Sequence, residues 1–439
     1  MHKSSYLSFV AIFFLAFTLP YTVKAQADSQ VSGGSFYSGI GFGAPVDQFS
    51  PYSMGMGLSG VSNYTGFSPS ISNPSHWGLI RFSQGNLAAS VNQFEARDQS
   101  DIAQNASFAI ESFQLAFPIF RDRLGVSVSF TPTVRNEFRQ VNFGEFNPLP
   151  GFSDNIEYEV NTIGSGGINR FEAGFGFRVS DFLSVGYAIS SNQLTINHEM
   201  FPAFSNIAFR SNQFNRKLDG NAFGHRFGVY TFKSGLLRSE DQLAFGATLS
   251  LPLSISAEES ITSFRQINNQ RVRIELNENS PQRFGSVKLP LEINTGLTYN
   301  LNRFTNVVAE LLIQRWDEAE YSFNQNQEQY FKDRVRAGLG FQYHPYRSDQ
   351  PGGFLSNIKY SIGTSYDSGH LSINGQDIET IFLNAGIGLM SQRTPSSIDL
   401  SFHYGFRGTD SSNLVKENIW GFKLSLNMAE LMFLRQRFQ

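Results

Sequence analysis

Apolar and polar residues alternate along most of the chain from about residue 85 to its end. The stretch 124–130, for example, reads Leu-Gly-Val-Ser-Val-Ser-Phe, and 398–406 reads Ile-Asp-Leu-Ser-Phe-His-Tyr-Gly-Phe. Successive side chains of a β-strand point to opposite faces, so each such segment has one apolar and one polar face. The pattern predicts an all-β protein built from two-faced strands.

About fourteen alternating segments are expected, at 85–95, 106–118, 123–134, 168–178, 182–196, 221–232, 241–253, 286–300, 304–320, 331–344, 356–369, 378–391, 397–408 and 416–428. A soluble β-sandwich shares the alternation, but three features favour a transmembrane barrel. The segments run about 10–16 residues, which is longer than most soluble strands. Aromatic residues gather near their ends, as in the interfacial girdles of membrane barrels. Their polar faces carry charged residues that a dry core would not tolerate unpaired.

The connections between these segments alternate in length. Long ones are expected at 135–167, 197–220 and 254–285, and short ones at 121–122, 180–181 and 300–303. Outer-membrane barrels have short periplasmic turns and long external loops. Every long connection follows an odd-numbered segment, so both ends of the barrel portion face the periplasm, as an even number of strands requires.

The composition agrees with a membrane barrel. The chain holds 44 Phe, 16 Tyr and 39 Gly, 16% of its residues are charged, and its mean hydropathy is −0.22. An apolar outer face and a polar inner face cancel in such an average. After residue 25, no stretch approaches the roughly eighteen uninterrupted apolar residues that indicate a transmembrane helix. The formal net charge of −3 gives no reason to expect nucleic acid as a partner.

The first 25 residues predict a secretory signal peptide. Lys3 is followed by the apolar run 9–17, and Val23 and Ala25 place small residues at −3 and −1 of a cleavage site. A retained membrane anchor is the alternative, but the apolar run is short for a span of ~20 residues. The chain has no cysteine, which excludes lipoprotein attachment, disulfides and cysteine-based metal sites.

Residues 26–84 differ from the rest of the chain. They are rich in Gly, Ser, Pro and Asn and show no sustained alternation, yet aromatic residues such as Phe42 and Trp77 recur in them. A disordered tail is one interpretation. A plug folded inside the barrel accounts for both features, since irregular backbone is tolerated at membrane depth where protein surrounds it. The predicted domains are a signal peptide at 1–25, a plug (hatch) at 26–84 and a transmembrane barrel at 85–439.

The stretch 53–62 reads Ser-Met-Gly-Met-Gly-Leu-Ser-Gly-Val-Ser, and 72–75 reads Ser-Asn-Pro-Ser. Together they resemble the plug of FadL-type outer-membrane transport proteins, which typically has a Gly-Met-Gly-Gly-Ala-rich stretch followed by Asn-Pro-Ala-Gly. Asn-Pro is kept here, whereas Ser and His replace the usual small pair. The resemblance assigns to the plug motif Gly55, Gly57, Gly60, Asn73, Pro74 and Ser75.

Other parts of the chain resemble the same family. The stretch 335–343 resembles its arginine-led, glycine-interrupted strand that ends in Tyr, and 291–297 with 314–317 resembles the preceding pair. The run 404–418 resembles the FadL-like proteins of Bacteroidetes-type bacteria. The resemblance implies a fourteen-stranded antiparallel barrel in the outer membrane of a Gram-negative cell, with an N-terminal plug in its lumen. It also implies diffusion of hydrophobic molecules, with plug movement and a lateral opening of the wall.

The leading hypothesis is therefore passive uptake of a hydrophobic small molecule or lipid, such as a long-chain fatty acid. We expect a monomer embedded in outer-membrane lipid. The substrate is expected to adsorb first in a groove lined by external aromatic residues, namely Phe201, Phe204, Phe209 and Phe214. Two alternatives remain open: a polar-solute porin without a plug, and an envelope component that assists protein secretion or surface assembly, as some FadL-like proteins of this bacterial group do.

Motifs for enzymatic chemistry fail on their context. The stretch 55–60 has the G-x-G-x-x-G spacing of a dinucleotide site, but Pro51 precedes it and neither a helical pattern nor a suitably placed acidic residue follows. Asp399, Ser401 and His403 share one strand face, where neighbours lie ~7 Å apart and a nucleophile cannot reach its base. The histidines show no metal-ligand spacing. We therefore expect no enzyme, no catalytic residue, no cofactor and no metal.

Overall fold

The computed structural model describes residues 33–66, 68–99, 102–147, 155–206, 209, 211–267, 270–324, 329–345, 354–391, 396–411 and 414–430. The predicted signal peptide at 1–25 lies outside this part of the chain. Within the described residues, no helix is both long enough and apolar enough to cross a membrane.

Almost all of the regular structure is β-strand. The strands are β1 (Ala44–Pro45), β2 (Ser83–Arg97), β3 (Ile102–Phe120), β4 (Leu124–Arg135), β5 (Phe138–Phe146), β6 (Ile156–Ser180), β7 (Leu183–Phe204), β8 (Gln213–Ser234), β9 (Gln242–Ser250), β10 (Leu253–Ile267), β11 (Gln270–Glu275), β12 (Phe284–Leu289), β13 (Glu292–Asn302), β14 (Thr305–Gln314), β15 (Glu320–Tyr321), β16 (Arg334–Tyr343), β17 (Ile358–Asp367), β18 (Ser372–Ile373), β19 (Gln376–Asp377), β20 (Thr380–Met390), β21 (Ser397–Arg407) and β22 (Lys416–Glu430). Short 3₁₀ helices complete it: η1 (Phe36–Gly39), η2 (Met54–Met56), η3 (Pro74–Leu79), η4 (Pro281–Arg283), η5 (Trp316–Glu318) and η6 (Phe354–Asn357).

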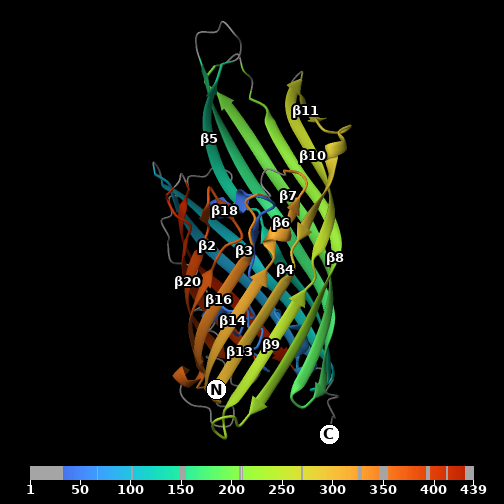
Figure 1. The fold of residues 1–439 in the computed structure, drawn as a ribbon, viewed down its shortest axis with the longest axis vertical. Helices are drawn as coiled ribbons and strands as arrows, with labels where there is room; N and C mark the ends of the chain where they lie inside the picture. The colour runs from blue at the N-terminus through green and yellow to red at the C-terminus, as the bar shows by residue number, and fades with distance from the viewer. Residues whose placement is uncertain are drawn as a thin grey trace, which may run out of the picture. The chain divides into compact units, whose positions relative to one another are not determined.

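The long strands form one antiparallel sheet that closes on itself (Figure 1). Each strand pairs with its neighbour round the wall, and β2 finally pairs with β22 along its whole length. In some places two shorter strands follow one another along the same long strand, as β4 and β5 do along one edge of β6. The result is the predicted closed antiparallel barrel of 14 strands.

An apolar band surrounds part of the wall. On β6, Phe171 and Phe175 point outwards and are 46% and 45% exposed, whereas Glu172 between them points into the lumen and is 4% exposed. Ile381 and Leu383 extend the exposed apolar surface onto β20. A barrel in lipid needs an apolar outside and tolerates a polar lumen, so this band marks the membrane-spanning part of the wall.

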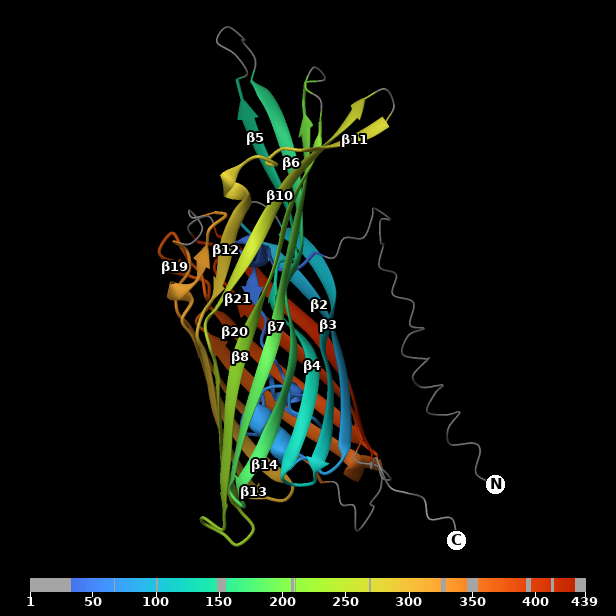
Figure 2. The same ribbon diagram turned by 90° about the vertical axis from the view of Figure 1, so that its right-hand side faces the viewer.

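Several strands continue well beyond this band. β6 has 25 residues and β7 and β8 have 22 each, although about 9–11 residues cross a bilayer. Figures 1 and 2 show β5, β6, β10 and β11 rising past the level at which the other strands end. The prediction of long loops at 135–167, 197–220 and 254–285 was therefore wrong, because strands occupy most of these ranges. We call this region the external extension, comprising 138–146, 156–169, 191–204, 213–222, 253–267 and 270–275.

The polarity of the two faces inverts in the external extension. Leu194 on β7 and Leu218 on β8 face inwards and are each 1% exposed, while the outward-facing Gln193 and Asp219 are exposed to solvent. Outside the membrane, the wall therefore follows the rule of a soluble protein, with apolar residues inside. One buried apolar cluster, which includes Ile168, Leu194 and Leu218, fills this end of the barrel.

Residues 33–66 and 68–82, called the lumenal segment below, lie inside the barrel (Figure 2). They include η1, β1, η2 and η3, and Met56 and Leu58 are fully buried between the segment and the wall. At the external end Phe42 joins the apolar cluster and stacks on Trp316, with 5.4 Å between the ring centroids. The lumenal segment thus occupies the space that a barrel of this width leaves unfilled by wall side chains alone.

Candidate functional site

The three glycines of the predicted plug motif make the tight turns and close approaches of the lumenal segment. Gly57 and Gly60 have φ of +67° and +80°, in the left-handed region that favours glycine. At Gly55, an added Cβ would lie 2.1 Å from the Ser361 hydroxyl and 3.0 Å from the Cα of Gly386 on the wall. The glycines therefore let this part of the segment lie directly against the barrel.

Glu310 on β14 binds the turn at Ser59–Val61. Its buried carboxylate accepts hydrogen bonds from the N–H groups of Ser59 at 2.6 Å, Gly60 at 2.7 Å and Val61 at 3.0 Å, and from the Ser59 hydroxyl at 2.8 Å. Successive N–H groups that point the same way form a nest for an anion. Hydrogen bonds to a carboxylate are about twice as strong as neutral ones, so Glu310 is a principal anchor of the segment.

Asn73, Pro74 and Ser75 begin η3. The Asn73 side chain caps the helix by accepting from the Ser75 N–H at 3.0 Å, and Pro74 occupies the first helical position, where no N–H is needed. The Asn73 amide also donates to the carbonyls of Val61 at 2.8 Å and Val229 on β8 at 3.1 Å. The Asn-Pro-Ser part of the motif therefore fixes η3 both to its own segment and to the wall.

A trough of wall glycines receives η3. Gly176 on β6, Gly186 on β7 and Gly228 on β8 lie opposite one another in register. A Cβ on Gly186 would lie 2.3 Å from the carbonyl carbon of Pro74, and one on Gly228 would lie 2.3 Å from Asn73 Oδ1. Backbone therefore packs directly on backbone here, which leaves no room for a solute between η3 and these strands.

Charged wall residues hold the rest of the lumenal segment. Arg226 on β8 forms an ion pair with Glu172 and donates to the carbonyl of Ile71 at 2.7 Å. Arg334 on β16 donates to the carboxylate of Asp47 at 2.8 Å. Removing one partner of a buried charged contact is costly, so these contacts hold the segment against the wall in this structure.

Sequence reasoning missed these anchors. It assigned the inward-facing charges to a polar lumen, because nothing in the alternation shows which of them contacts another segment. Further examples are the side chains of Gln342 and Lys359, which donate to the Tyr52 carbonyl at 3.0 Å each, and Glu417, which accepts from the Phe36 N–H at 2.7 Å. The available signal was that ionisable residues such as Glu172, Arg226 and Glu310 stand on the polar faces of the predicted strands.

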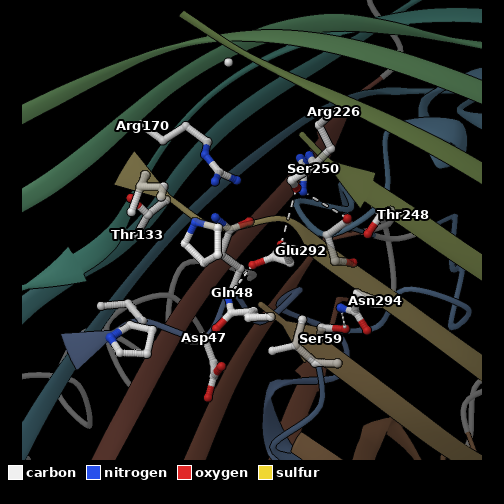
Figure 3. Close-up of a pocket in the computed structure, with 18 of the residues that line it drawn as sticks. Asp47, Gln48, Ser59, Thr133, Arg170, Arg226, Thr248, Ser250, Glu292 and Asn294 are labelled. Atoms are coloured by element: carbon white, nitrogen blue, oxygen red, sulfur yellow. Dashed lines mark hydrogen bonds between the residues drawn. The ribbon is translucent and has the colours of Figure 1, made fainter. Parts of the chain in front are cut away.

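Several cavities remain between the lumenal segment and the wall, and two of them lie on either side of β1. The first has an empty volume of about 1120 Å³ and lies against β6 to β9 and β13 (Figure 3). The second, of about 910 Å³, lies against β2 to β4 and β20 to β22. Pro45, Val46 and Asp47 line both, so the segment around β1 separates them. Both cavities combine apolar side chains with charged ones.

The wall has a gap between β3 and β4. Among the described residues, their ladder ends where Phe113 lies opposite Phe130. Beyond it β3 pairs only with β2, and the free edge of β4 pairs with β1, with Pro45 opposite Val134. Ser107, on the part of β3 that has no partner on the β4 side, lines the second cavity. The lumenal segment itself thus occupies an interruption in the barrel wall.

The predicted aromatic groove is only partly assembled. Phe204 and Phe209 contact each other and Phe146 at the tip of the external extension, with ring centroids 5.8 Å apart for the first pair. Phe201 points to the opposite face of β7, since it lies three residues before Phe204, and it is 37% exposed. Phe214 lies on β8 opposite Met200. The four residues do not share one surface.

The polar face of β21 serves the packing of the lumen. Asp399 forms an ion pair of 2.6 Å with Lys359 and accepts hydrogen bonds from Ser397 and Asn427. His403 packs against the ring of Phe382, with 6.0 Å between the centroids. Within the described part of the chain, no group of three or more His, Cys, Asp or Glu residues could hold a metal ion.

Comparison with known proteins places this geometry in a family. Three solved structures share the fold: a Pseudomonas aeruginosa FadL homologue (13% identity, TM-score 0.55, covering 88% of this chain and 99% of that one), the Ralstonia pickettii toluene transporter TbuX (12%, 0.55, 87% and 98%) and the Pseudomonas putida toluene transporter TodX (13%, 0.52, 88% and 99%). No functionally curated protein is similar enough in sequence to count as a relative. The family model described as BamG matches residues 8–439. The chain therefore belongs to the BamG family, and it is an outer-membrane β-barrel of the FadL-like fold.

Proposed function

We propose that the protein is a passive uptake channel for small hydrophobic molecules, long-chain fatty acids among them, and that the lumenal segment is its plug. The observation that carries the proposal is the gap between β3 and β4, which the chain's own β1 fills. A wall that is interrupted and then closed by a separable segment has a built-in route between lumen and lipid. Unpaired backbone in hydrocarbon is costly, so a permanently closed barrel would have no reason to leave these edges unpaired.

The two ends of the lumenal segment suit different tasks. Near η3 the segment packs backbone to backbone on the glycine trough, which blocks a route along the barrel axis. Near β1 it is held by side-chain contacts such as Asp47 with Arg334, and cavities lie on both sides of it. The part around β1 is therefore the part that can move, and a substrate that displaces it would leave through the β3–β4 gap.

The entry end suits an apolar substrate. Phe42 of the lumenal segment lies among Trp316, Tyr321 and Phe331, with ring centroids 5.4 to 6.0 Å apart. Apolar molecules gain free energy when they leave water for such surroundings, at about 25 cal/mol per Å² of buried surface. A hydrophobic compound would therefore bind by inserting between these rings, next to the segment that gates the cavities.

A disulfide across the gap tests the proposal. Residues directly opposite in an antiparallel ladder have Cα atoms about 4.5–5.5 Å apart, which a disulfide can span. The chain has no cysteine, so Pro45→Cys with Val134→Cys would create a single bridge between β1 and β4. We expect the oxidised variant to stop uptake of a radiolabelled long-chain fatty acid into proteoliposomes, and a reductant to restore it.

A matched pair separates the gate from general effects of a bridge. Val185→Cys with Val229→Cys would join β7 and β8 in the regular wall and should leave uptake unchanged in both redox states. If the wild-type protein takes up no fatty acid or aromatic hydrocarbon, the channel proposal fails. If the oxidised Pro45–Val134 variant transports normally, the channel stands but its gate is elsewhere.

A second candidate function is an envelope component that binds another protein and assists secretion or surface assembly. The observation in its favour is the external extension, whose outward face is polar and which exceeds what a membrane crossing needs. Lys217→Glu with Asp219→Lys would reverse two exposed charges on that face. Loss of co-purifying envelope proteins from this variant, with fatty acid uptake retained, would favour the second candidate.

A further inference from the structure

The first cavity contains two charged side chains that form no ion pair among the described residues. Arg170 on β6 and Glu292 on β13 both line it, and Figure 3 shows them directed into the same space, with Gln48 of the lumenal segment beside Glu292. Among the described residues, neither forms an ion pair within 4.0 Å. The other arginines of the cavity are paired, Arg226 with Glu172 and Arg336 with Asp47.

In the part of the chain that the structure describes, Arg170 and Glu292 form hydrogen bonds only with uncharged side chains. The Arg170 guanidinium donates one hydrogen bond of 3.4 Å, from Nε to the Asn192 side chain. The Glu292 carboxylate accepts from the Ser250 hydroxyl at 3.4 Å and from the Gln314 amide. A charge in a confined space costs free energy unless an opposite charge or strong hydrogen bonds compensate it. Both groups therefore retain capacity for a charged ligand.

The wall keeps the two charges apart. β7, β8 and β9 separate β6 from β13, and with about 4.8 Å between neighbouring strands the two backbones lie roughly 19 Å apart along the wall. Arg170 and Glu292 project towards each other across the cavity, close enough to attract each other electrostatically but without forming an ion pair within 4.0 Å. A ligand between them can contact both at once.

We propose that this cavity binds a small zwitterion with an apolar body, such as a hydrophobic amino acid, with its carboxylate on Arg170 and its ammonium on Glu292. The inference rests on the proposed channel, because the ligand reaches the cavity through it. A simple anion would be attracted by Arg170 and repelled by Glu292, and a simple cation the reverse. A zwitterion satisfies both, and the planar fork of the guanidinium suits a carboxylate.

The rest of the cavity suits an apolar body. Leu251, Leu253, Leu289, Leu312 and Trp316 line the same space. The lining also holds many charged and polar side chains, which would fix the orientation of a ligand whose apolar body lies against these residues. The chemistry of the cavity thus differs from what an unsubstituted hydrocarbon would require.

Three probes of similar shape test the charge requirement: L-phenylalanine, 3-phenylpropionate, which lacks the ammonium, and 2-phenylethylamine, which lacks the carboxylate. Binding to the full-length protein in detergent is measured by saturation-transfer NMR and equilibrium dialysis. We expect L-phenylalanine to bind at least about tenfold more tightly than either other probe, because each of those leaves one charge uncompensated. Equal binding of all three would overturn the proposal.

Two variants assign the contacts. Arg170→Gln should weaken L-phenylalanine binding at least about tenfold, and Glu292→Gln should remove the preference for L-phenylalanine over 3-phenylpropionate. Glu258→Gln, which changes an exposed carboxylate of the external extension, is the control and should change nothing. Unchanged probe preference in either cavity variant would contradict the assignment.

A ligand could fail to bind because the lumenal segment blocks its entry and not because the site is absent. The binding measurement is therefore repeated in Glu310→Gln, in which one anchor of that segment is weakened. No binding in either background overturns the proposal. The channel and the zwitterion site can also fail independently. Absent fatty acid uptake with intact L-phenylalanine binding would sink the proposed channel alone, and normal uptake without binding would sink the site alone.

Discussion

The carboxylate of Glu310 on the barrel wall accepts a hydrogen bond of 2.7 Å from the backbone N–H of Gly60 in the lumenal segment. It also accepts hydrogen bonds from the N–H groups of Ser59 and Val61, so one carboxylate binds three successive N–H groups of the turn. Glu310→Gln would place an amide donor against backbone donors and remove the charge. We expect the turn to lose about 2–3 kcal/mol of anchoring free energy.

Single-channel recording in planar bilayers measures the effect of Glu310→Gln. We expect larger or more frequent conductance events than in the wild type, and faster proteolysis of the lumenal segment. Glu258→Gln on the external extension is the control. Wild-type conductance in Glu310→Gln would mean that the other anchors hold the segment without it.

The glycine trough gives a steric prediction. In Gly186→Ala, the new Cβ would lie 2.3 Å from the Pro74 carbonyl carbon, so η3 must move away from β7. We expect a loss of about 1–3 kcal/mol in the free energy of unfolding, from the cost of overpacking, together with increased conductance. Gly85→Ala is the matched control, because its Cβ would meet no atom closer than 3.4 Å. Equal effects of the two substitutions would argue against the trough as the seat of η3.

The inversion of polarity predicts where the membrane ends. Phe175→Arg places a charge on the outward face in the middle of the apolar band and should destabilise the folded barrel by about 2–4 kcal/mol. Gln193→Arg lies on the outward face of the adjacent strand, in the external extension, and should change stability by less than about 0.5 kcal/mol. Reversible unfolding by urea from lipid vesicles measures both. If both substitutions reduced the stability of the barrel by a similar amount, the apolar band would not end between Phe175 and Gln193.

The turn between β8 and β9 predicts a pH effect outside the membrane. Burial alone raises the pKa of the Asp241 carboxyl, but hydrogen bonds from the Leu237 N–H, the Tyr299 hydroxyl and the N–H groups of Leu236 and Arg238 outweigh it and lower this pKa below its usual value. The stabilisation by Asp241 is therefore present above the usual carboxyl pKa and is lost as the pH falls through the lowered one.

Asp241→Asn should accordingly reduce stability near neutral pH and leave it almost unchanged in strong acid. Hydrogen exchange of the turn amides, followed from pH 7 down to a pH below the lowered pKa of Asp241, measures this difference. A loss of protection that is the same at both pH values would show that the Asp241 charge does not contribute.

The sequence predicted the membrane-spanning wall well because lipid imposes a simple rule on it. Outward residues such as Phe171 and Phe175 must be apolar, and the alternation follows directly. It failed above the membrane, where Leu194 and Leu218 are apolar because they face inwards. A pattern of period two shows that two faces differ, but it does not show which medium each face meets. The extension was consequently interpreted as loops.

The candidate site divides in the same way. The glycines and Asn73-Pro74 are recognisable because backbone conformation and capping restrict residue type locally. Glu310, Arg226 and Arg170 are not, since their roles depend on contacts between residues far apart in the chain. No local rule distinguishes a lumenal charge that holds the lumenal segment from one that faces a cavity.

The seam between β2 and β22 has a consequence for how the molecule is made. The lumenal segment precedes β2, yet it is enclosed by strands that are synthesised after it, up to the last one. Its backbone fits into the glycine trough too closely to be threaded into a finished cylinder. We therefore expect the wall to form around the lumenal segment while the chain inserts into the membrane. The pairing of β2 with β22 would then be the last step. Substitutions in the trough should delay this closure as well as displace the lumenal segment in the finished barrel.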